Sequence, residues 1–362
     1  MLGLDQSQLA NRLGVSRITY SKFENGRAAI SDDVFYRLSH IFDVKPDALL
    51  ESPQRRAEAF FRHRAVRSQR EKACNEQMMI DAERKFSDYE FLEKVTGDGK
   101  ELGSALLGMR RAVSSPADAR AFGTEVRSTL FRQGYDNVRR FGDALENGGV
   151  KYLAFDFPMA SEFGFSLRLP SRAYAIAVNT SREVTGERQL FTLCHEAGHI
   201  LMQHHADDRD RSLAAENIRE KEADAFASGM LIPDVDFNAA WEGASGKPWF
   251  ERILAVKQMF AVSYLTVIHR LEEKFRESTG KQSVPPYRTW FKENYLRRFG
   301  RTLPAHEEAC PADIRIESAR FARLARKAYT DGEITLPRLA ELLGKSLMET
   351  RAMVNEWARE GV

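Results

Sequence analysis

The amino-acid sequence predicts a mainly α-helical protein of the α+β class, with one small antiparallel sheet among many helices. Apolar residues recur at helical spacing along most of the 362 residues, while strand-like patterns are confined to residues 150–179. Those strand-like segments come directly before two long helical stretches. A chain of this length is expected to form two or three domains.

Composition narrows the class of protein. Hydrophobic residues make up 43% of the chain and charged residues 29%, as in ordinary soluble globular proteins, and the net charge of +2 singles out no partner. No apolar run approaches the roughly 18 residues that span a membrane, and no signal segment is recognised, so we expect a cytoplasmic protein. Three scattered cysteines, Cys74, Cys194 and Cys310, argue against a disulfide framework.

Residues 5–24 predict a helix, a turn and a second helix. Asp5 and Gln8 have the spacing of a capping box, and Gly14 stands where a helix C-cap needs a positive φ. Ser16 then caps a second helix over 17–24, and residues 34–50 continue the pattern. Together these segments resemble the XRE/Cro-type helix-turn-helix DNA-binding domain.

That resemblance implies that the second helix is the recognition helix, which enters the major groove of DNA. Its outward side chains would be Arg17, Thr19, Tyr20 and Ser21, and Lys22 would lie near phosphate. Gln6 and Ser16 would contact phosphate or base edges from the helix starts. The DNA-binding residues so implied are Gln6, Ser16, Arg17, Tyr20, Ser21 and Lys22. Domains of this type often bind two half-sites, so a homodimer is one expected assembly.

Two features bear on this DNA-binding domain. Residues 1–53 hold six Lys/Arg against seven Asp/Glu, so DNA affinity must come from local placement or from the basic stretch over 55–72. The sequence also starts at Met1, immediately before the motif, where such domains have a further helix. We therefore expect either a translation start upstream or a domain without its first helix.

The segments that follow lead to the predicted sheet. Residues 54–95 predict a long helix that Gly97-Asp98-Gly99 ends, and residues 116–146 predict another that ends at 147–149. Strands follow at 150–157, 164–169 and 174–179, and we expect the first to pair with the second in an antiparallel sheet. The edge of such a sheet suits an extended peptide, which would bind by strand addition.

A metal-binding motif lies on the next helix, over 187–204. His195-Glu196-Ala197-Gly198-His199 is an HExxH sequence, whose two histidines share one helix face and reach a single metal ion. Glu196 then lies beside the metal-bound water as general base. Cys194 belongs to the apolar stripe of this helix, so we assign it to the core.

A catalytic zinc site usually has three protein ligands, and the sequence offers alternatives for the third. Glu220 on the following helix, predicted over 214–231, is preferred, and Asp224 one turn later could hold the outer nitrogen of a ligand histidine. His205 is the second candidate, but Met202 occupies the position where the HExxHxxGxxH pattern needs glycine. Glu222 is the fallback.

These two motifs resemble the ImmA/IrrE family of metallopeptidases. The residues that carry the resemblance are the HExxH sequence, the segment Glu220-Lys221-Glu222-Ala223-Asp224-Ala225-Phe226-Ala227 and Leu231-Ile232-Pro233, within roughly residues 120–275. The resemblance implies His195, His199 and Glu220 as metal ligands and Glu196 as general base. It also implies Zn²⁺, with Mn²⁺ as the alternative, and a repressor protein as the substrate.

The remaining sequence predicts helices over 249–259 and 263–277, a boundary at Pro285-Pro286 and a helical C-terminal region. Within it, residues 336–346 fit either another helix-turn-helix, with Gly344 as the turn, or a simple helical hairpin. We therefore divide the chain into a DNA-binding domain at 1–53, a helical linker at 54–115, a metallopeptidase domain at 116–280 and a helical region at 281–362.

Three classes of function stay open at this point. The protein is a regulatory protease that cuts a repressor, a transcription factor whose metal domain senses or stabilises, or an antitoxin or phage-regulatory component that acts by binding. Glu196 favours the first, because a structural zinc site has no use for a base between its ligands. A donor to the oxyanion would also be needed, and Tyr174, His204 and His205 are the candidates.

Overall fold

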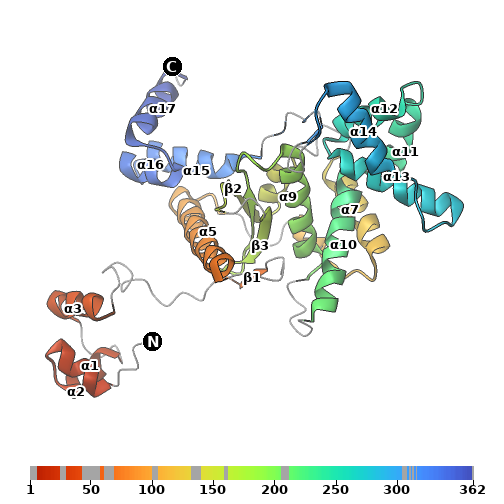
Figure 1. The fold of residues 1–362 in the computed structure, drawn as a ribbon. Helices are drawn as coiled ribbons and strands as arrows, with labels where there is room; N and C mark the ends of the chain where they lie inside the picture. The colour runs from red at the N-terminus through yellow and green to blue at the C-terminus, as the bar shows by residue number, and fades with distance from the viewer. Residues whose placement is uncertain are drawn as a thin grey trace. The chain divides into compact units, whose positions relative to one another are not determined.

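The computed structural model divides the chain into two compact units, Met1–Arg56 and Ala57–Val362, which are described separately (Figure 1). Within them the structure describes residues 6–24, 30–42, 58–60, 69–99, 105–131, 140–158, 162–204, 212–303 and 316–360, together with residues 308, 309, 311 and 314. The description below is limited to these residues. Asp5, half of the predicted capping box, and His205 lie outside them.

The first unit contains α1 (Gln6–Leu13), α2 (Arg17–Glu24) and α3 (Asp32–Phe42). Leu9, Leu13 and Val34 form its buried core. Gly14 has the positive φ of 70° that the sequence predicts for a C-cap, and Ser16 Oγ accepts a hydrogen bond of 3.0 Å from the amide of Thr19 at the start of α2. The predicted helix, turn and helix are thus present.

The second unit is built around a mixed sheet of four strands in the order β1–β3–β4–β2. These strands are β1 (Glu58–Phe60), β2 (Val150–Phe155), β3 (Gly164–Arg168) and β4 (Tyr174–Asn179). β4 pairs antiparallel with β3 and parallel with β2. The mainly α-helical fold class is confirmed, but the expectation of a purely antiparallel sheet with β2 beside β3 is wrong.

The position of β4 explains this topology. All six of its residues are buried, which is typical of a strand that has helices over both faces of the sheet and a neighbouring strand on each side. β4 is therefore a central strand rather than an edge strand. Its side chains alternate between two cores: Tyr174, Ile176 and Val178 join one cluster, and Ala175 and Ala177 join the other. β2 extends the sheet on the side of β4 that β3 leaves open.

β1 is the strand that the sequence did not predict. Residues 58–60 lie inside a stretch expected to be helical, yet their backbone pairs antiparallel with residues 166–168 of β3. The helix α5 occupies only Gln69–Thr96 and ends at Gly97, whose φ is 66°. A three-residue segment carries too little periodicity to distinguish strand from helix, so tertiary pairing decided its conformation.

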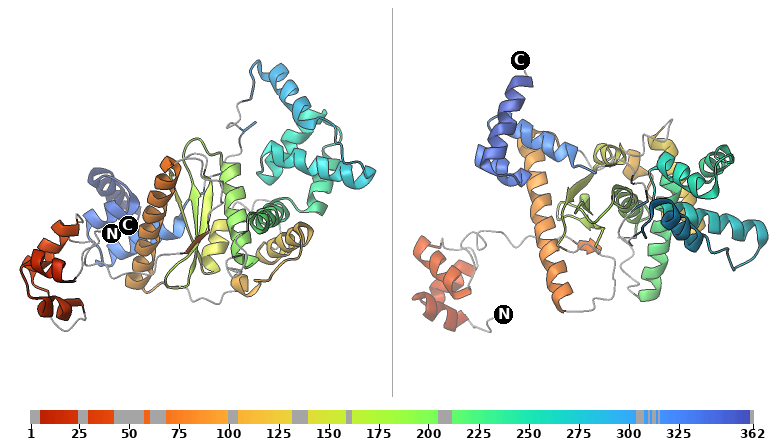
Figure 2. Two further views of the ribbon diagram at one scale, coloured as in Figure 1. Left: turned by 60° about the horizontal axis from the view of Figure 1, so that its bottom comes forward. Right: turned by 45° about the horizontal axis from the view of Figure 1, so that its top comes forward.

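Helices cover both faces of the sheet. α5, α15 (Ala319–Thr330) and α16 (Leu336–Leu343) contribute to the core on one face. α7 (Pro116–Leu130), α8 (Phe141–Asn147), α9 (Gly186–Leu201) and α10 (Leu213–Leu231) contribute to the core on the other. The left view in Figure 2 shows the sheet between α5 and the green helices α9 and α10.

Two points of close packing fix α10 in this layer. A Cβ at Gly229 would lie 2.1 Å from the carbonyl oxygen of Arg120 in α7, and one at Gly198 would lie 2.9 Å from the ring of Phe226. Glycine is therefore required where α10 meets α7 and α9.

The helix predicted over 116–146 is not continuous, since α7 ends at Leu130 and Phe131 is extended.

The remaining helices of the second unit are α6 (Ala105–Gly108), α11 (Asp234–Gly243), α12 (Trp249–Phe260), α13 (Tyr264–Thr279), α14 (Tyr287–Phe299) and α17 (Leu347–Glu360). α12 and α13 correspond to the helices predicted from the sequence. Among the described residues, no helix is long and apolar enough to cross a membrane.

Candidate metal centre and DNA-binding unit

Three side chains from α9 and α10 converge in the second unit. His195 and His199 lie one turn apart on α9, with their Nε2 atoms 3.0 Å from each other. Glu220 of α10 approaches both, at 3.5 Å from His195 Nε2 and 3.3 Å from His199 Nε2. Among the described residues, these three form the one group whose donor atoms all lie within 4.8 Å of one another.

The donor set fits a zinc ion. Zinc bonds of about 2.0–2.1 Å in a tetrahedron hold neighbouring ligand atoms roughly 3.3 Å apart. In the structure the two Nε2 atoms are 3.0 Å apart, and each lies near that distance from one carboxylate oxygen of Glu220, Oε2 for His195 and Oε1 for His199. Two imidazole nitrogens and one carboxylate are also the ligand types of catalytic zinc sites, which leave a fourth position for water.

The outer nitrogen of His195 is held by the carboxylate that the sequence suggested. Asp224 Oδ1 lies 2.9 Å from His195 Nδ1. A hydrogen bond there keeps a proton on Nδ1 and fixes the ring so that Nε2 is the nitrogen that faces Glu220. Asp224 lies one helical turn after Glu220, so a single face of α10 supplies both carboxylates.

His199 is held in a different way, by a residue that the sequence did not predict in this role. His204 Nδ1 lies 2.9 Å from His199 Nδ1, and the other nitrogen of His204 lies 3.2 Å from Glu222. His204 reaches this position because the chain turns at Gln203, whose φ is 62°. Glu222, the fallback ligand, therefore pairs with His204 on the outer side of His199.

The electrostatics of His195, His199 and Glu220 favour a positive charge between these side chains. Burial opposes protonation of His195, but its hydrogen bonds to Asp224 and Glu220 outweigh burial and raise its pKa to about 9. Burial would raise the pKa of Glu220, yet the bonds to His195 and His199 dominate and hold it well below its ordinary value. Glu220 is thus an anion beside two nitrogen donors, which is the charge pattern that a cation requires.

Glu196 follows His195 on α9 and contacts the sheet. Its side chain is buried, and Ser166 Oγ of β3 donates a hydrogen bond of 2.8 Å to Glu196 Oε2. Ser166 was not predicted. The sequence feature that could have indicated this contact is a polar serine in the middle of β3. Its neighbours Phe165 and Leu167 belong to the core on the opposite face of the sheet.

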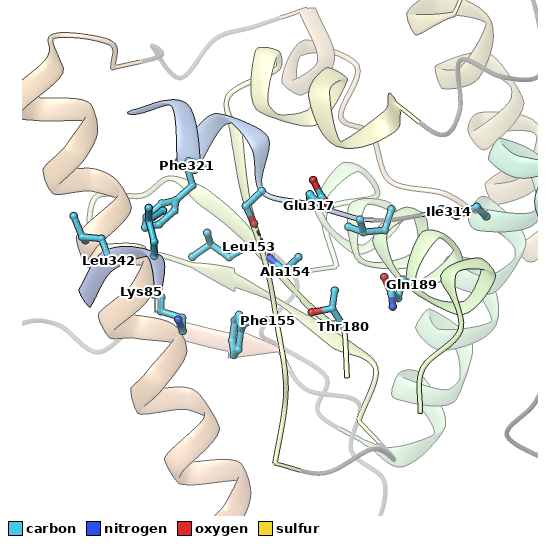
Figure 3. Close-up of a pocket in the computed structure, with 14 residues that line it drawn as sticks. Lys85, Leu153, Ala154, Phe155, Thr180, Gln189, Ile314, Glu317, Phe321 and Leu342 are labelled. Atoms are coloured by element: carbon cyan, nitrogen blue, oxygen red, sulfur yellow. Dashed lines mark hydrogen bonds between the residues drawn. The ribbon is translucent and has the colours of Figure 1, made fainter. Parts of the chain in front are cut away.

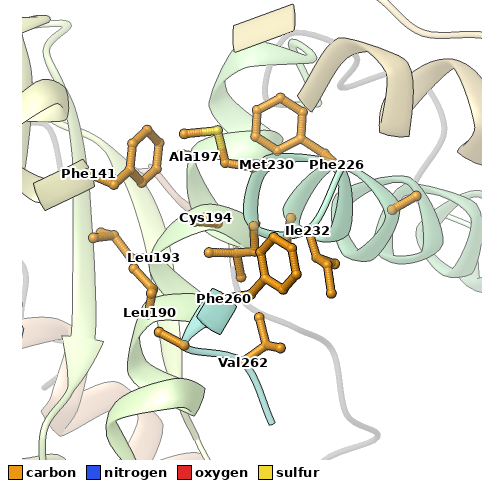
Figure 4. Close-up of a cluster of buried hydrophobic side chains, with 14 of the residues drawn as sticks. Phe141, Leu190, Leu193, Cys194, Ala197, Phe226, Met230, Ile232, Phe260 and Val262 are labelled. Atoms are coloured by element: carbon orange, nitrogen blue, oxygen red, sulfur yellow. The ribbon is translucent and has the colours of Figure 1, made fainter. Parts of the chain in front are cut away.

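An apolar core beneath α9 holds the site in place. Leu190, Leu193, Cys194 and Ala197 face Phe226, Met230 and Phe260 in the cluster drawn in Figure 4. Cys194 is fully buried there, and burial raises the pKa of its thiol, as expected for a core residue rather than a ligand. Tyr174, one candidate oxyanion donor, is buried in the same core with the guanidinium of Arg110 over its ring.

A separate pocket of about 520 Å³ lies at the other edge of the sheet, beside β2 (Figure 3). Phe155, Thr180, Glu317 and Phe321 are among the residues that line it, and no member of the His195, His199 and Glu220 group does. Ser318 Oγ accepts a hydrogen bond of 2.8 Å from the amide of Ala154, so the chain itself occupies part of this edge.

The first unit presents most of the predicted DNA-binding residues at its surface. Gln6 begins α1, Ser16 precedes α2, and both are exposed, as are Arg17 and Lys22. Ser21 is half-buried. Tyr20 differs from the expectation of an outward side chain, because it packs against the core of Leu9, Leu13 and Val34. Ile18, which was not among the predicted DNA-binding residues, is 71% exposed at the second position of α2.

Comparison with known families agrees with both units. Residues 149–272 match the family described as the IrrE N-terminal-like domain, and residues 1–49 match the family described as helix-turn-helix. No curated protein matches the chain. The chain thus has an N-terminal segment similar to XRE-type helix-turn-helix domains and a later segment similar to IrrE/ImmA-like peptidase domains.

Proposed function

We propose that this protein is a cytoplasmic regulator, in which a zinc-dependent peptidase cleaves a repressor protein and the N-terminal unit binds DNA. In this proposal the peptidase domain comprises residues 116–280, with the segment over 54–115 before it and the C-terminal region over 281–362 after it. The observation that carries the proposal is that His195, His199 and Glu220 converge, while Glu196 on the same helix α9 is close enough for its charge to act on His195. Ligands alone would serve a structural ion, whereas an acid–base carboxylate beside them serves hydrolysis.

The residues have separate roles in this reaction. His195, His199 and Glu220 would hold a zinc ion, which would supply Lewis acidity to the scissile carbonyl and to a water molecule. Glu196 accepts a proton from the attacking water and delivers it to the leaving amine. Ser166 holds one oxygen of Glu196, so the other oxygen is the one that carries the proton. Mn²⁺ is the alternative ion, since nitrogen and carboxylate donors accept it as well.

The sheet suggests how the substrate binds. β3 bears Ser166, and its outer side pairs with β1, with Phe60 opposite Ser166 in the register. An extended peptide paired with β3 at the same place would pass beside Glu196, as in other cases of strand addition. We infer that a substrate takes this position by replacing β1, because β1 covers the edge of β3 next to the site.

The test uses the full chain and candidate repressors, namely helix-turn-helix proteins encoded beside its gene. Glu196→Gln should retain zinc and lose cleavage, whereas Glu183→Gln, an exposed position before α9, should change neither. A chelator should abolish cleavage by the unaltered protein. Cleavage by the Glu196→Gln protein at the unaltered rate would refute the assignment of the base.

A second candidate function rests on the helix-turn-helix unit. In it the protein is a transcription factor or antitoxin-type regulator, and the metal domain is a sensor or a structural module. Sequence-specific DNA binding without cleavage of any candidate repressor, in the presence of Zn²⁺ or Mn²⁺, would select this function over the first.

A further inference from the structure

The C-terminal helices repeat the helix-turn-helix pattern of the first unit. The sequence L-A-x-x-L-G-x-S occurs at residues 9–16 and again at 339–346, with the same five residues in the same order and spacing. In both places the first leucine and the alanine are buried in the local core. The second copy connects α16 to α17, and α15 precedes it.

The two turns have the same backbone geometry. Gly344 has a φ of 63°, close to the 70° of Gly14. The residue after the glycine donates to the alanine carbonyl in both copies, at 3.0 Å from Val15 and 2.9 Å from Lys345. This is the Schellman closure of a helix, and its recurrence at the same residue of both copies defines one turn type.

The start of the second helix is also the same. The serine Oγ accepts from the amide three residues later, from Thr19 at 3.0 Å in the first unit and from Glu349 at 3.2 Å in α17. Two residues after the serine, each helix exposes a large apolar side chain, Ile18 at 71% and Met348 at 81%. In the first unit this arrangement belongs to a segment that matches the helix-turn-helix family.

The outward face of α17 has the chemistry that reads base edges. Thr350 is fully buried and Trp357 packs beneath Arg326, which fixes the inner side of the helix. Arg351, Asn355 and Arg359, at spacings of four, are exposed on the opposite side. Arginine pairs with guanine, asparagine pairs with adenine, and an apolar side chain such as Met348 contacts the thymine methyl group.

Acidic groups do not occupy the centre of this face. The carboxylate of Glu349 accepts from the amide of Ser346 at 2.9 Å and from its hydroxyl at 2.6 Å, so it belongs to the cap. Glu356 lies at the margin, about 100° around the helix from Asn355. The supporting helix α16 is fixed to α5 by Arg338, which pairs with Asp88 at 2.5 Å, and by an ion pair between Arg84 and Glu341.

We propose that α16 and α17 form a second DNA-binding module, with α17 as a recognition helix that enters the major groove of double-stranded DNA. The inference is independent of the peptidase reaction. It gives one polypeptide two reading helices, α2 and α17, so a single chain contacts two sequence elements. Linking two modules raises the affinity for a DNA that carries both elements, provided that both can be reached at once.

The test is selection of duplexes from a randomised DNA pool by the full chain. The unaltered protein should enrich two sequence elements, and a protein with Arg17→Ala and Lys22→Ala in α2 should retain one of them. Arg351→Ala with Asn355→Ala should lose that element and weaken binding of the selected duplex about 10- to 100-fold. Circular dichroism should show an unchanged helix content, since both side chains are exposed.

The matched control changes the same two residue types on another surface helix. Asn294→Ala with Arg297→Ala in α14 should leave both enriched elements and the affinity unchanged. The proposal is overturned if Arg351→Ala with Asn355→Ala enriches the same elements at the same affinity as the unaltered protein. It is equally overturned if the α2 variant enriches no sequence, because α17 would then read no DNA by itself.

Discussion

Replacing Asp224 by asparagine is expected to weaken zinc binding about tenfold. Asparagine keeps an oxygen at the position of Asp224 Oδ1, 2.9 Å from His195 Nδ1, but removes the negative charge that polarises the ring. Loss of such an outer partner costs about 10–100-fold in metal affinity, or roughly 1.4–2.8 kcal/mol. The Asp224 side chain is 51% exposed, so solvent screens its charge and the low end of this range applies.

The measurement is a competition titration of Zn²⁺ against a chromophoric chelator, with metal content of the purified protein as a second readout. Asp156→Asn serves as the matched control, because Asp156 is exposed and lies at the end of β2. Asp224→Ala should cost more than Asp224→Asn, since it also removes the hydrogen bond. An unchanged zinc affinity in both Asp224 variants would refute the reasoning that Asp224 orients His195.

Two further predictions concern the sheet edge and a buried acid. Replacing residues 58–60 by three prolines is expected to raise kcat/KM for a cleaved repressor, because prolines cannot donate to β3 and β1 would no longer occupy its edge; an unchanged value would contradict the inferred binding place. Burial beside Tyr89, more than any other effect, raises the pKa of Glu146 to about 7 from an ordinary 4.5. The folded state therefore binds the additional proton, so stability falls by up to about 3 kcal/mol as pH rises from 4.5 to 7. Glu146→Gln should flatten this dependence in urea unfolding, whereas a pH profile that keeps its slope would show that other groups cause it.

Much of the metal centre could be predicted because its geometry is local. The spacing of His195 and His199 places both rings on one face of any helix, and Glu220 and Asp224 share a face for the same reason. Glu222, two residues after Glu220, points about 200° away around the helix. Helix geometry therefore distinguishes Glu220 from Glu222 as the ligand. It does not identify the residues on other elements that contact these two side chains.

The partners from other elements were not predictable in the same way. Ser166 reaches Glu196 from β3, and His204 reaches His199 through a turn at Gln203. Alternation along a strand indicates which residues share a face, but it does not identify the helix that covers that face. The same limit explains the wrong pairing of β2, since periodicity contains no information about which strand lies alongside.

By itself the sequence determined the two motifs, their placement on helices and the mainly α-helical class, because each depends on contacts within a few residues. Only the tertiary structure decided that β4 is central, that residues 58–60 cover the edge of β3 and that His204 and Glu222 lie on the outer side of His199. These features join residues far apart in the chain, and their formation depends on burial of complementary surfaces rather than on local spacing.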